Sequence, residues 1–315
     1  MDVLLAIFRS LSDASRLRIL LLLRRMELSV GEIAAVLGQS QPRVSRHIRI
    51  LADAGVVDRA KEGAWVFVRL GKAAISGPAL AAIDALGGSD LAAADLERLT
   101  AVRAERAAAA DAWFAAHADD WDKERSLAAA EADVEAAIIA ALGGHSLGAL
   151  IDVGTGTGRM IELLGPRARS ALGIDRSPEM LRLARGRIES SGLVHAQVRA
   201  GDMYALPGSD ASADTVVVHQ VLHFADDPGA VVREAARVLA PGGRLLVVDL
   251  MPHDREDLRT TRRHVRLGFA DEAVTGWMAA AGLSASVVAQ LPSMDGLGVS
   301  LWLGQQPANA ERRAA

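Results

Sequence analysis

The chain has 315 residues, half of them apolar, and a formal net charge of −4. This length predicts about two domains with sizeable cores. The chain contains no cysteine, which excludes disulfide bonds, thiolate metal sites and cysteine nucleophiles, and no apolar run of about 18 residues, which excludes a typical membrane-spanning helix.

Charge is distributed unevenly along the chain. Residues 1–72 hold 12 Lys and Arg against 7 Asp and Glu, a net charge of +5, whereas the remaining residues hold 23 against 32, a net charge of −9. A basic module before an acidic one fits a nucleic-acid footprint, although an ordinary solvated surface would have the same composition. Residues 1–10 lack the pattern of a secretory signal, so we expect a soluble cytoplasmic protein with no membrane partner.

The first module begins with two predicted helices. Apolar residues recur through residues 13–25 with the density of a buried helix. Ser29 and Glu32 then have the spacing of a capping box, which predicts a short helix that ends at Gly38.

A further helix is expected from about residue 40 to 54, with Pro42 in its first turn, where the missing N–H costs nothing. Val44, Ile48 and Leu51 are its inward stripe, and its polar side chains are expected to form an exposed face. Such a face can read base edges and hold phosphates. The predicted DNA-binding residues are Ser40, Gln41, Arg43, Ser45, Arg46, His47 and Arg49, together with Lys61 beyond the helix.

Two short alternating segments, 56–59 and 64–70, flank Lys61 and Gly63 and predict a hairpin wing with a basic tip. Arginines taken singly usually belong to a solvated face. Together with the helix, turn, helix order and the local charge, they favour DNA binding.

Residues 1–72 resemble the ArsR family of winged-helix repressors through LSDASRLRILLLL, LSVGEIAAVLGQSQPRVSRHIRILADAGVV and RAKEGAWVFVRL. The resemblance implies a homodimer that presents two recognition helices to a pseudo-palindromic double-stranded operator. Arsenite-sensing members carry a Cys-Val-Cys triplet where this chain has Ser29, Val30 and Gly31, so that metalloid site is missing and no metal is expected.

Residues 73–146 are predicted to form a helical connector, because the segment is rich in alanine. It can be a dimerisation element or a mere spacer. The residues placed to line a dimer seam are Leu91, Leu96, Leu99 and Val102. The aromatic residues Trp113, Phe114 and Trp121 fit either core packing or a lid over a ligand site.

Residues 147–315 alternate strand and helix signals, which predicts an α/β domain with a doubly wound parallel sheet. Segments 285–290 and 298–304 are expected to add an antiparallel edge. Between an apolar strand at 147–153 and a helix at 159–164 lie three alternate glycines, Gly154, Gly156 and Gly158. Such a strand-to-helix turn exposes backbone N–H groups to a ligand, although a tight turn without a ligand has the same pattern.

Acidic residues follow two further strands of this predicted sheet. Asp175 stands 21 residues after Gly154, at the end of the second strand, where it could accept both hydroxyls of a ribose. Asp202 and Met203 follow the third strand and could contact an adenine, although a methionine alone more often fills a core. The glycine spacing differs from that of NAD-binding domains.

This domain resembles the Rossmann-like class I S-adenosylmethionine-dependent methyltransferases through LIDVGTGTGRM, LGIDRSPEML, GDMYALP, DTVVVHQVLHF and ARVLAPGGRLLVVDL. The resemblance implies that the three glycines approach the amino-acid part of the nucleoside, Asp175 binds the ribose and His219 lies near the sulfur. The full predicted set is Asp152, Gly154, Gly156, Gly158, Asp175, Arg176, Met180, Asp202, Met203 and His219.

The whole chain is similar to bacterial ArsR regulators fused to such a domain, some of which are S-adenosylhomocysteine-responsive repressors of methionine-cycle genes. This predicts a repressor whose effector is S-adenosylhomocysteine or S-adenosylmethionine. The alternative is an active methyltransferase with a small-molecule acceptor, for which His219 and His223 are candidate bases. His253 and His264 are further candidates, although each histidine alone is more often structural.

Overall fold

The structure, a computed structural model, divides into two compact units: the first unit, Met1–Ala109, and the second unit, Ala110–Ala315. It describes residues 2–25, 28–62, 65–71, 73–85, 93–101, 104, 130–293 and 297–308. The boundaries expected at residues 72 and 146 stay a prediction, and Trp113, Phe114 and Trp121 lie outside the described residues.

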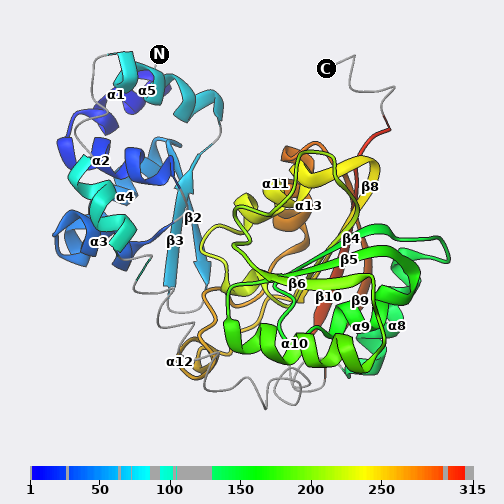
Figure 1. Ribbon diagram of the computed structural model, residues 1–315. Coiled ribbons are helices and arrows are strands. Elements are labelled where there is room, and N and C mark those ends of the chain that lie inside the picture. Colours follow the sequence, from blue (N-terminus) through cyan, green and yellow to red (C-terminus); the bar gives the residue numbers. More distant parts are fainter. Residues whose placement is uncertain are drawn as a thin grey trace. The chain divides into compact units, whose positions relative to one another are not determined.

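The first unit opens with the helices α1 (Asp2–Leu11), α2 (Ala14–Leu23), α3 (Val30–Leu37) and α4 (Gln41–Asp53), drawn in blue in Figure 1. Asp13 caps α2 by accepting a hydrogen bond from the Arg16 amide. Ser29 and Glu32 form the predicted capping box of α3, which ends at Gly38 with left-handed backbone. The predicted helix-turn-helix is therefore confirmed.

A small antiparallel sheet completes the winged fold. Its strands are β1 (Leu28–Ser29), β2 (Val57–Glu62) and β3 (Trp65–Leu70), in the order β1-β3-β2. The β2–β3 hairpin confirms the predicted wing. The sequence did not predict β1, because two residues are too few to show an alternating pattern.

The connector begins with helix α5 (Ala73–Ala85), and residues 93–101 are also helical. Leu99 is only 4% exposed and packs into the core that α2, α3 and α4 share, with Leu96 against it. Leu99 therefore packs within the first unit, Leu96 is partly buried against the same core, and the proposed dimer seam stays a prediction. Leu91 and Val102 lie outside the described residues.

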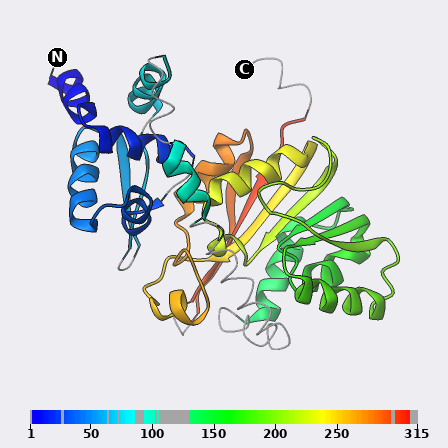
Figure 2. The ribbon, with the colours of Figure 1, turned by 60° about the vertical axis from the view of Figure 1, so that its left-hand side comes forward.

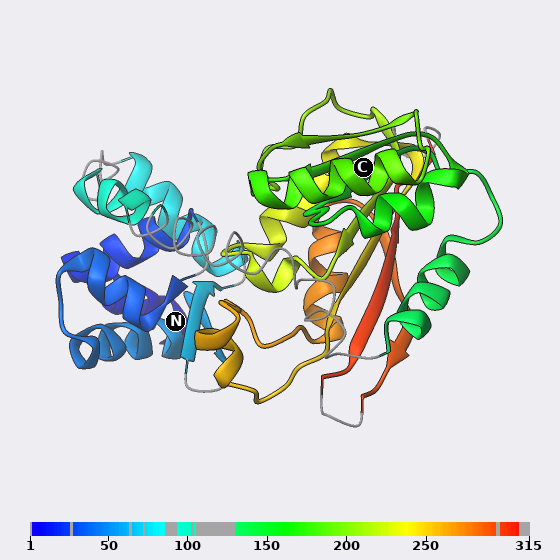
Figure 3. The ribbon, with the colours of Figure 1, turned by 60° about the horizontal axis from the view of Figure 1, so that its bottom comes forward.

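The second unit is built on a seven-stranded sheet in the order β6-β5-β4-β7-β8-β10-β9 (Figure 1). The strands are β4 (Gly148–Val153), β5 (Ala168–Asp175), β6 (Ala196–Ala200), β7 (Ala213–His219), β8 (Leu239–Leu250), β9 (Ser284–Leu291) and β10 (Val299–Gln305). The first five strands in this order are parallel, and β10 is antiparallel to both β8 and β9. The predicted antiparallel edge, orange and red in Figure 3, is confirmed.

Helices cover both faces of this sheet, as Figures 1 and 2 show. One face carries α8 (Glu131–Leu142), α9 (Arg159–Leu164) and α10 (Pro178–Ser190), and the other carries α11 (Pro228–Val238) and α13 (Asp271–Ala280). A buried apolar cluster fills each of the two layers between helices and sheet. The short elements η3 (Gly165–Arg167), η4 (Leu222–Phe224) and α12 (Asp257–Thr261) lie in connecting segments.

The carboxyl ends of the parallel strands β4 to β8 lie along the same side of the sheet, so the loops that follow these strands gather there. The predicted nucleoside-binding residues lie at or near these carboxyl ends. In the part of the chain that the structure describes, no helix is both long and apolar enough to cross a membrane.

Candidate functional site

The glycine loop, residues 154–158, joins β4 to α9 in a conformation that favours glycine. Gly154, Gly156 and Gly158 have φ values of +69°, +52° and +83°. A side chain at Gly154 would also clash with Val221, because an added Cβ would lie 2.4 Å from the Val221 Cγ2. The loop backbone is therefore held against the segment that follows β7, and the amides of Gly154 and Thr155 donate to the Ile174 carbonyl oxygen of β5 at 2.8 and 2.9 Å.

Asp175 closes the glycine loop from the end of β5. Its Oδ2 accepts a hydrogen bond of 2.8 Å from the Gly156 amide, and its Oδ1 accepts one of 2.9 Å from the Ser177 amide. Burial raises the pKa of the Asp175 carboxyl, and the two amides oppose that shift. The structure thus joins two of the predicted ligand residues, Gly156 and Asp175, in one hydrogen-bonded unit.

The other predicted residues around the loop differ in exposure. Asp152 is only 1% exposed and accepts a 2.6 Å hydrogen bond from the Thr155 hydroxyl, so it supports the loop from inside the domain. Met180 is buried in the first turn of α10, whereas Arg176 is exposed. His219, at the end of β7, is buried.

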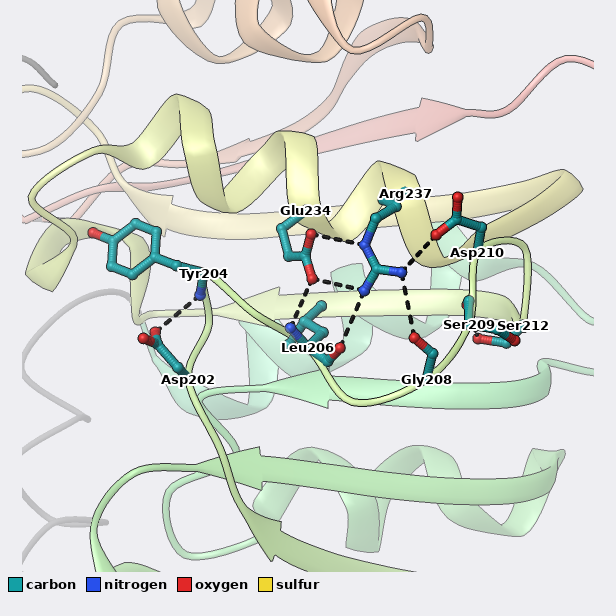
Figure 4. Close-up of polar contacts among 9 residues, drawn as sticks. All are labelled: Asp202, Tyr204, Leu206, Gly208, Ser209, Asp210, Ser212, Glu234 and Arg237. Carbon is teal, nitrogen blue, oxygen red and sulfur yellow. Dashed lines mark hydrogen bonds and ion pairs between the residues drawn. The ribbon is translucent and has the colours of Figure 1, made fainter. Parts of the chain in front are cut away.

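Asp202 begins a tight turn, residues 202–206, which we call the Asp202 turn. Its Oδ1 accepts from the Tyr204 amide at 3.0 Å (Figure 4), and its carbonyl oxygen accepts from the Ala205 amide at 3.1 Å. The Gly201 amide donates to the Asp175 carbonyl oxygen, which places the start of the turn beside Asp175. Asp202 is exposed. Met203 packs partly on the core, so it can fill the core, contact an adenine, or do both.

A histidine and a buried carboxylate meet after β7 and β8. The His223 Nδ1 lies 2.6 Å from Asp249 Oδ1, and Asp249 is fully buried at the end of β8. The Asp249 Oδ2 also accepts from the amides of Leu222 and His223. Asp249 therefore fixes both the backbone after β7 and the orientation of the His223 ring.

Two further histidines lie close to His223. The ring centroids of His223 and His264 are 4.2 Å apart. Burial lowers the pKa of His264 strongly, with the charges of His223 and His253 adding to the effect. Burial also lowers the pKa of His253. In the described part of the chain, no group of three or more His, Asp or Glu side chains could hold a metal ion.

In the first unit, α4 presents the exposed polar face predicted for DNA recognition. Val44, Ile48 and Leu51 are at most 1% exposed and face the core, as expected. The exposed residues of the predicted set are Ser40, Gln41, Arg43, Ser45, Arg46 and Arg49. Lys61 lies in β2, next to the tip of the wing.

The prediction that His47 belongs to this exposed face is wrong. His47 is 9% exposed, and its Nδ1 lies 3.7 Å from the Asp13 carboxylate that caps α2. Burial lowers the pKa of His47, with Asp13 opposing the shift. The reason is visible in the sequence: His47 is three residues after Val44 and four before Leu51, a spacing that belongs to the inward stripe.

Several contributors to the site were not predicted from the sequence. Asp249 has a detectable signal, since it is a single acid in the apolar strand GRLLVVDL. The hydrogen bond from Thr155 to Asp152 links neighbouring residues without any pattern that marks a binding site. Val221 has no signal, because its partner Gly154 lies far away in the chain. The same holds for Glu234 and Arg237 of α11, which hold the Asp202 turn (Figure 4).

The chain thus combines a unit of winged helix-turn-helix fold with a unit of α/β fold that carries this glycine loop after β4. Residues 13–59 match the model of the bacterial regulatory protein arsR family, and residues 151–247 match that of the methyltransferase domain. The chain therefore carries an arsR-family helix-turn-helix domain and a methyltransferase domain.

Relatives of known sequence match the methyltransferase region. The chain is 31% identical over 100 residues to the uncharacterized methyltransferase YcgJ of Bacillus subtilis, which is 32% of this chain and 40% of that protein. It is 40% identical over 106 residues to the demethylmenaquinone methyltransferase of Thermus thermophilus, which is 33% of this chain and 47% of that protein. The chain thus spans less than half the length of these curated relatives.

A solved structure supports the fold. A chain of the Haloferax volcanii complex that contains the Trm112 methyltransferase activator superposes with a TM-score of 0.51 and 22% identity, covering 62% of this chain and 97% of that chain. This likeness agrees with the class I methyltransferase fold of the second unit.

Proposed function

We propose that the protein is an arsR-type transcriptional repressor whose methyltransferase-fold unit binds S-adenosylhomocysteine or S-adenosylmethionine as an effector. The bound nucleoside controls the affinity of the protein for its operator, and the operator controls genes of the methionine and S-adenosylmethionine cycle. The observation that carries the proposal is the meeting of Gly156 and Asp175 beside the Asp202 turn, in a chain that also presents an exposed basic recognition helix.

The described residues fit a nucleoside of this kind. Positive φ values at Gly154, Gly156 and Gly158 give the loop a tight conformation that side chains rarely allow, and we expect its backbone to approach the amino-acid part of the ligand. Asp175 stands at the end of β5 to accept from the ribose, and the exposed Asp202 is available to the adenine amino group. When bound, S-adenosylmethionine supplies an electrophilic methyl group, which S-adenosylhomocysteine lacks.

The DNA-binding half of the proposal rests on α4. Arg43, Arg46 and Arg49 are exposed on one helix, where they can contact base edges and phosphates. A homodimer would present two such helices to successive major grooves, about 34 Å apart. We place the protein in the cytoplasm because its proposed partner is chromosomal DNA.

A DNA-binding titration tests the effector role. The full chain is first used to select double-stranded sites from a random pool, and its affinity for them is measured without nucleoside. S-adenosylhomocysteine and S-adenosylmethionine are then titrated separately, and at least one is expected to change the affinity. Unchanged affinity with both nucleosides at saturation would remove the effector role.

Two substitutions separate the functions of the two units. Arg46→Ala is expected to weaken DNA binding about tenfold or more, because it removes a base or phosphate contact, and to leave nucleoside binding unchanged. Asp175→Ala is expected to weaken nucleoside binding and to leave DNA binding without nucleoside unchanged. Calorimetry and DNA titration on both variants check this, and equal damage to both activities by each variant would contradict the division.

A second candidate function is methyl transfer to a small-molecule acceptor. The His223–Asp249 hydrogen bond favours it, because a carboxylate that accepts from Nδ1–H leaves the Nε2 lone pair to take a proton. Labelled methyl product formed by the wild type, and lost about a hundredfold in an Asp249→Asn variant that still binds S-adenosylhomocysteine, would support this function.

A further inference from the structure

The Asp202 turn has few bonds of its own. Within the turn, Asp202 accepts the amides of Tyr204 and Ala205, and its side chain is exposed. The segment follows the short strand β6, which has β5 as its only neighbour in the described sheet. The position of the Asp202 turn therefore depends on the contacts of its far end, its last residue Leu206.

Helix α11 holds that far end through two side chains one helical turn apart. The Leu206 amide donates to Glu234 Oε1 at 2.7 Å, and the Leu206 carbonyl oxygen accepts from Arg237 Nη2 at 3.1 Å. Both backbone polar groups of Leu206 are thus satisfied by α11 (Figure 4). The Leu206 side chain is buried in the core beneath the helix.

Glu234 and Arg237 also fix each other. Arg237 donates two parallel hydrogen bonds to the Glu234 carboxylate, at 2.7 and 2.9 Å, and this lowers the pKa of Glu234. The remaining Arg237 nitrogen donates to Asp210 Oδ1 at 2.7 Å and to the Gly208 carbonyl oxygen at 3.3 Å. Only a planar guanidinium can reach this set of acceptors at once.

The start of α11 makes a third attachment. The amide of Asp227, the N-cap of α11, donates to the Tyr204 hydroxyl at 3.1 Å. Burial raises the pKa of Tyr204 to about 12. The turn is therefore attached to the same helix at Tyr204 and at Leu206, on the side away from the exposed Asp202 carboxylate.

We propose that Glu234 and Arg237 are positioning residues for the nucleoside: they hold the Asp202 turn in its binding conformation before the ligand arrives. Neither residue contacts the ligand. They act by removing the entropy cost of ordering the turn on binding, which otherwise lowers affinity. The inference rests on the proposed function, since it assigns a role to residues behind the proposed adenine contact.

The test measures binding of S-adenosylhomocysteine and of adenosine to the full chain by calorimetry. Arg237→Gln is expected to raise the Kd of both ligands about tenfold, which corresponds to about 1.4 kcal/mol. Arg237→Lys keeps the charge but cannot form the fork, so an intermediate Kd is expected. Without ligand, the amides of Tyr204 and Leu206 should exchange hydrogen faster in Arg237→Gln, and saturating S-adenosylhomocysteine should restore their protection.

Arg244→Gln is the matched control. Arg244 also donates to two backbone carbonyl oxygens, those of Leu142 at 2.9 Å and Ser146 at 3.4 Å, but from the amino-terminal half of β8. It should lower the melting temperature without changing either Kd. If Arg237→Gln does not fold, Glu234→Gln replaces it, because Gln can still accept from the Leu206 amide but loses the ion pair.

Each outcome is decisive. Wild-type affinity in folded Arg237→Gln or Glu234→Gln would overturn the positioning role and leave the proposed function standing. An equal loss of affinity in Arg244→Gln would also overturn it, since the effect would then follow stability alone. A wild-type chain that binds neither S-adenosylhomocysteine nor S-adenosylmethionine would overturn both the inference and the proposed function.

Discussion

His264 occupies an environment that opposes its protonation. Its ring packs against His223, and its buried Nδ1 has no hydrogen-bond partner among the described residues. Burial is the main cause of its lowered pKa, and the nearby charges of His223, His253, Arg262 and Arg259 add to it. A proton on His264 would be a buried charge beside other cations.

We therefore predict that the second unit loses stability below about pH 6.5, the ordinary pKa of histidine. The unfolded His264 takes up a proton there and the folded one does not, so protons favour the unfolded state. The expected loss in unfolding free energy is at most about 1.4 kcal/mol per pH unit. Urea denaturation between pH 7.5 and about pH 5 measures it.

His264→Phe keeps a ring in the same place and removes the titrating group. The variant should lose less stability on acidification than the wild type. Substitution of His145 by Asn, at an exposed position of the same unit, should leave the pH dependence unchanged. Identical pH profiles for His264→Phe and the wild type would show that His264 does not control this dependence.

At the scale of elements, a buried carboxylate joins the helical segment 93–101 to the winged fold. Asp95 accepts two hydrogen bonds from Arg18 of α2, at 2.5 and 2.6 Å, and a third from Arg98. The Asp95 side chain is only 2% exposed. Arg98 also donates to the Val36 carbonyl oxygen in α3 at 2.7 Å, so the segment is tied to two helices of the DNA-binding fold.

Asp95→Ala is expected to destabilise the first unit by about 3 kcal/mol, because it leaves the partly buried Arg18 guanidinium without its carboxylate. Hydrogen exchange of peptides from α2 and α3 in the full chain would measure this effect unit by unit. Asp84→Ala is the control, since its ion pair with Arg24 is exposed and screened by water. Equal protection of α2 in Asp95→Ala and the wild type would contradict the assigned role.

The sequence predicts elements well where a local pattern determines them. The capping box at Ser29, the wing, and the strand, glycine loop and helix order from β4 to α9 all follow from residues near one another. Contacts between distant segments do not follow from such local patterns. The packing of Leu99 on the winged core and the attachment of Leu206 to α11 depend on tertiary structure, which periodicity does not encode.

At the scale of the whole molecule, each unit has its own buried core. Effector control therefore requires that the nucleoside bind more tightly to one DNA-binding state of the protein than to the other. A nucleoside with equal affinity for both states would change nothing, however tightly it bound. The four-species cycle of free protein, nucleoside complex, DNA complex and ternary complex contains all of the coupling.

This cycle must close, so the coupling is reciprocal. If saturating S-adenosylhomocysteine changes the DNA affinity by some factor, saturating DNA must change the affinity for S-adenosylhomocysteine by the same factor. We expect a factor of about 5 to 150, the usual range of such couplings. Calorimetry of nucleoside binding with and without the selected DNA, beside DNA titrations with and without nucleoside, measures both sides. Asp175→Ala should reduce the factor toward one at nucleoside concentrations that saturate the wild type. With S-adenosylmethionine in place of S-adenosylhomocysteine, a factor that appears in one direction only would mean that the methyl donor acts outside this equilibrium, through transfer of its methyl group to an acceptor, and would favour the methyltransferase over the repressor.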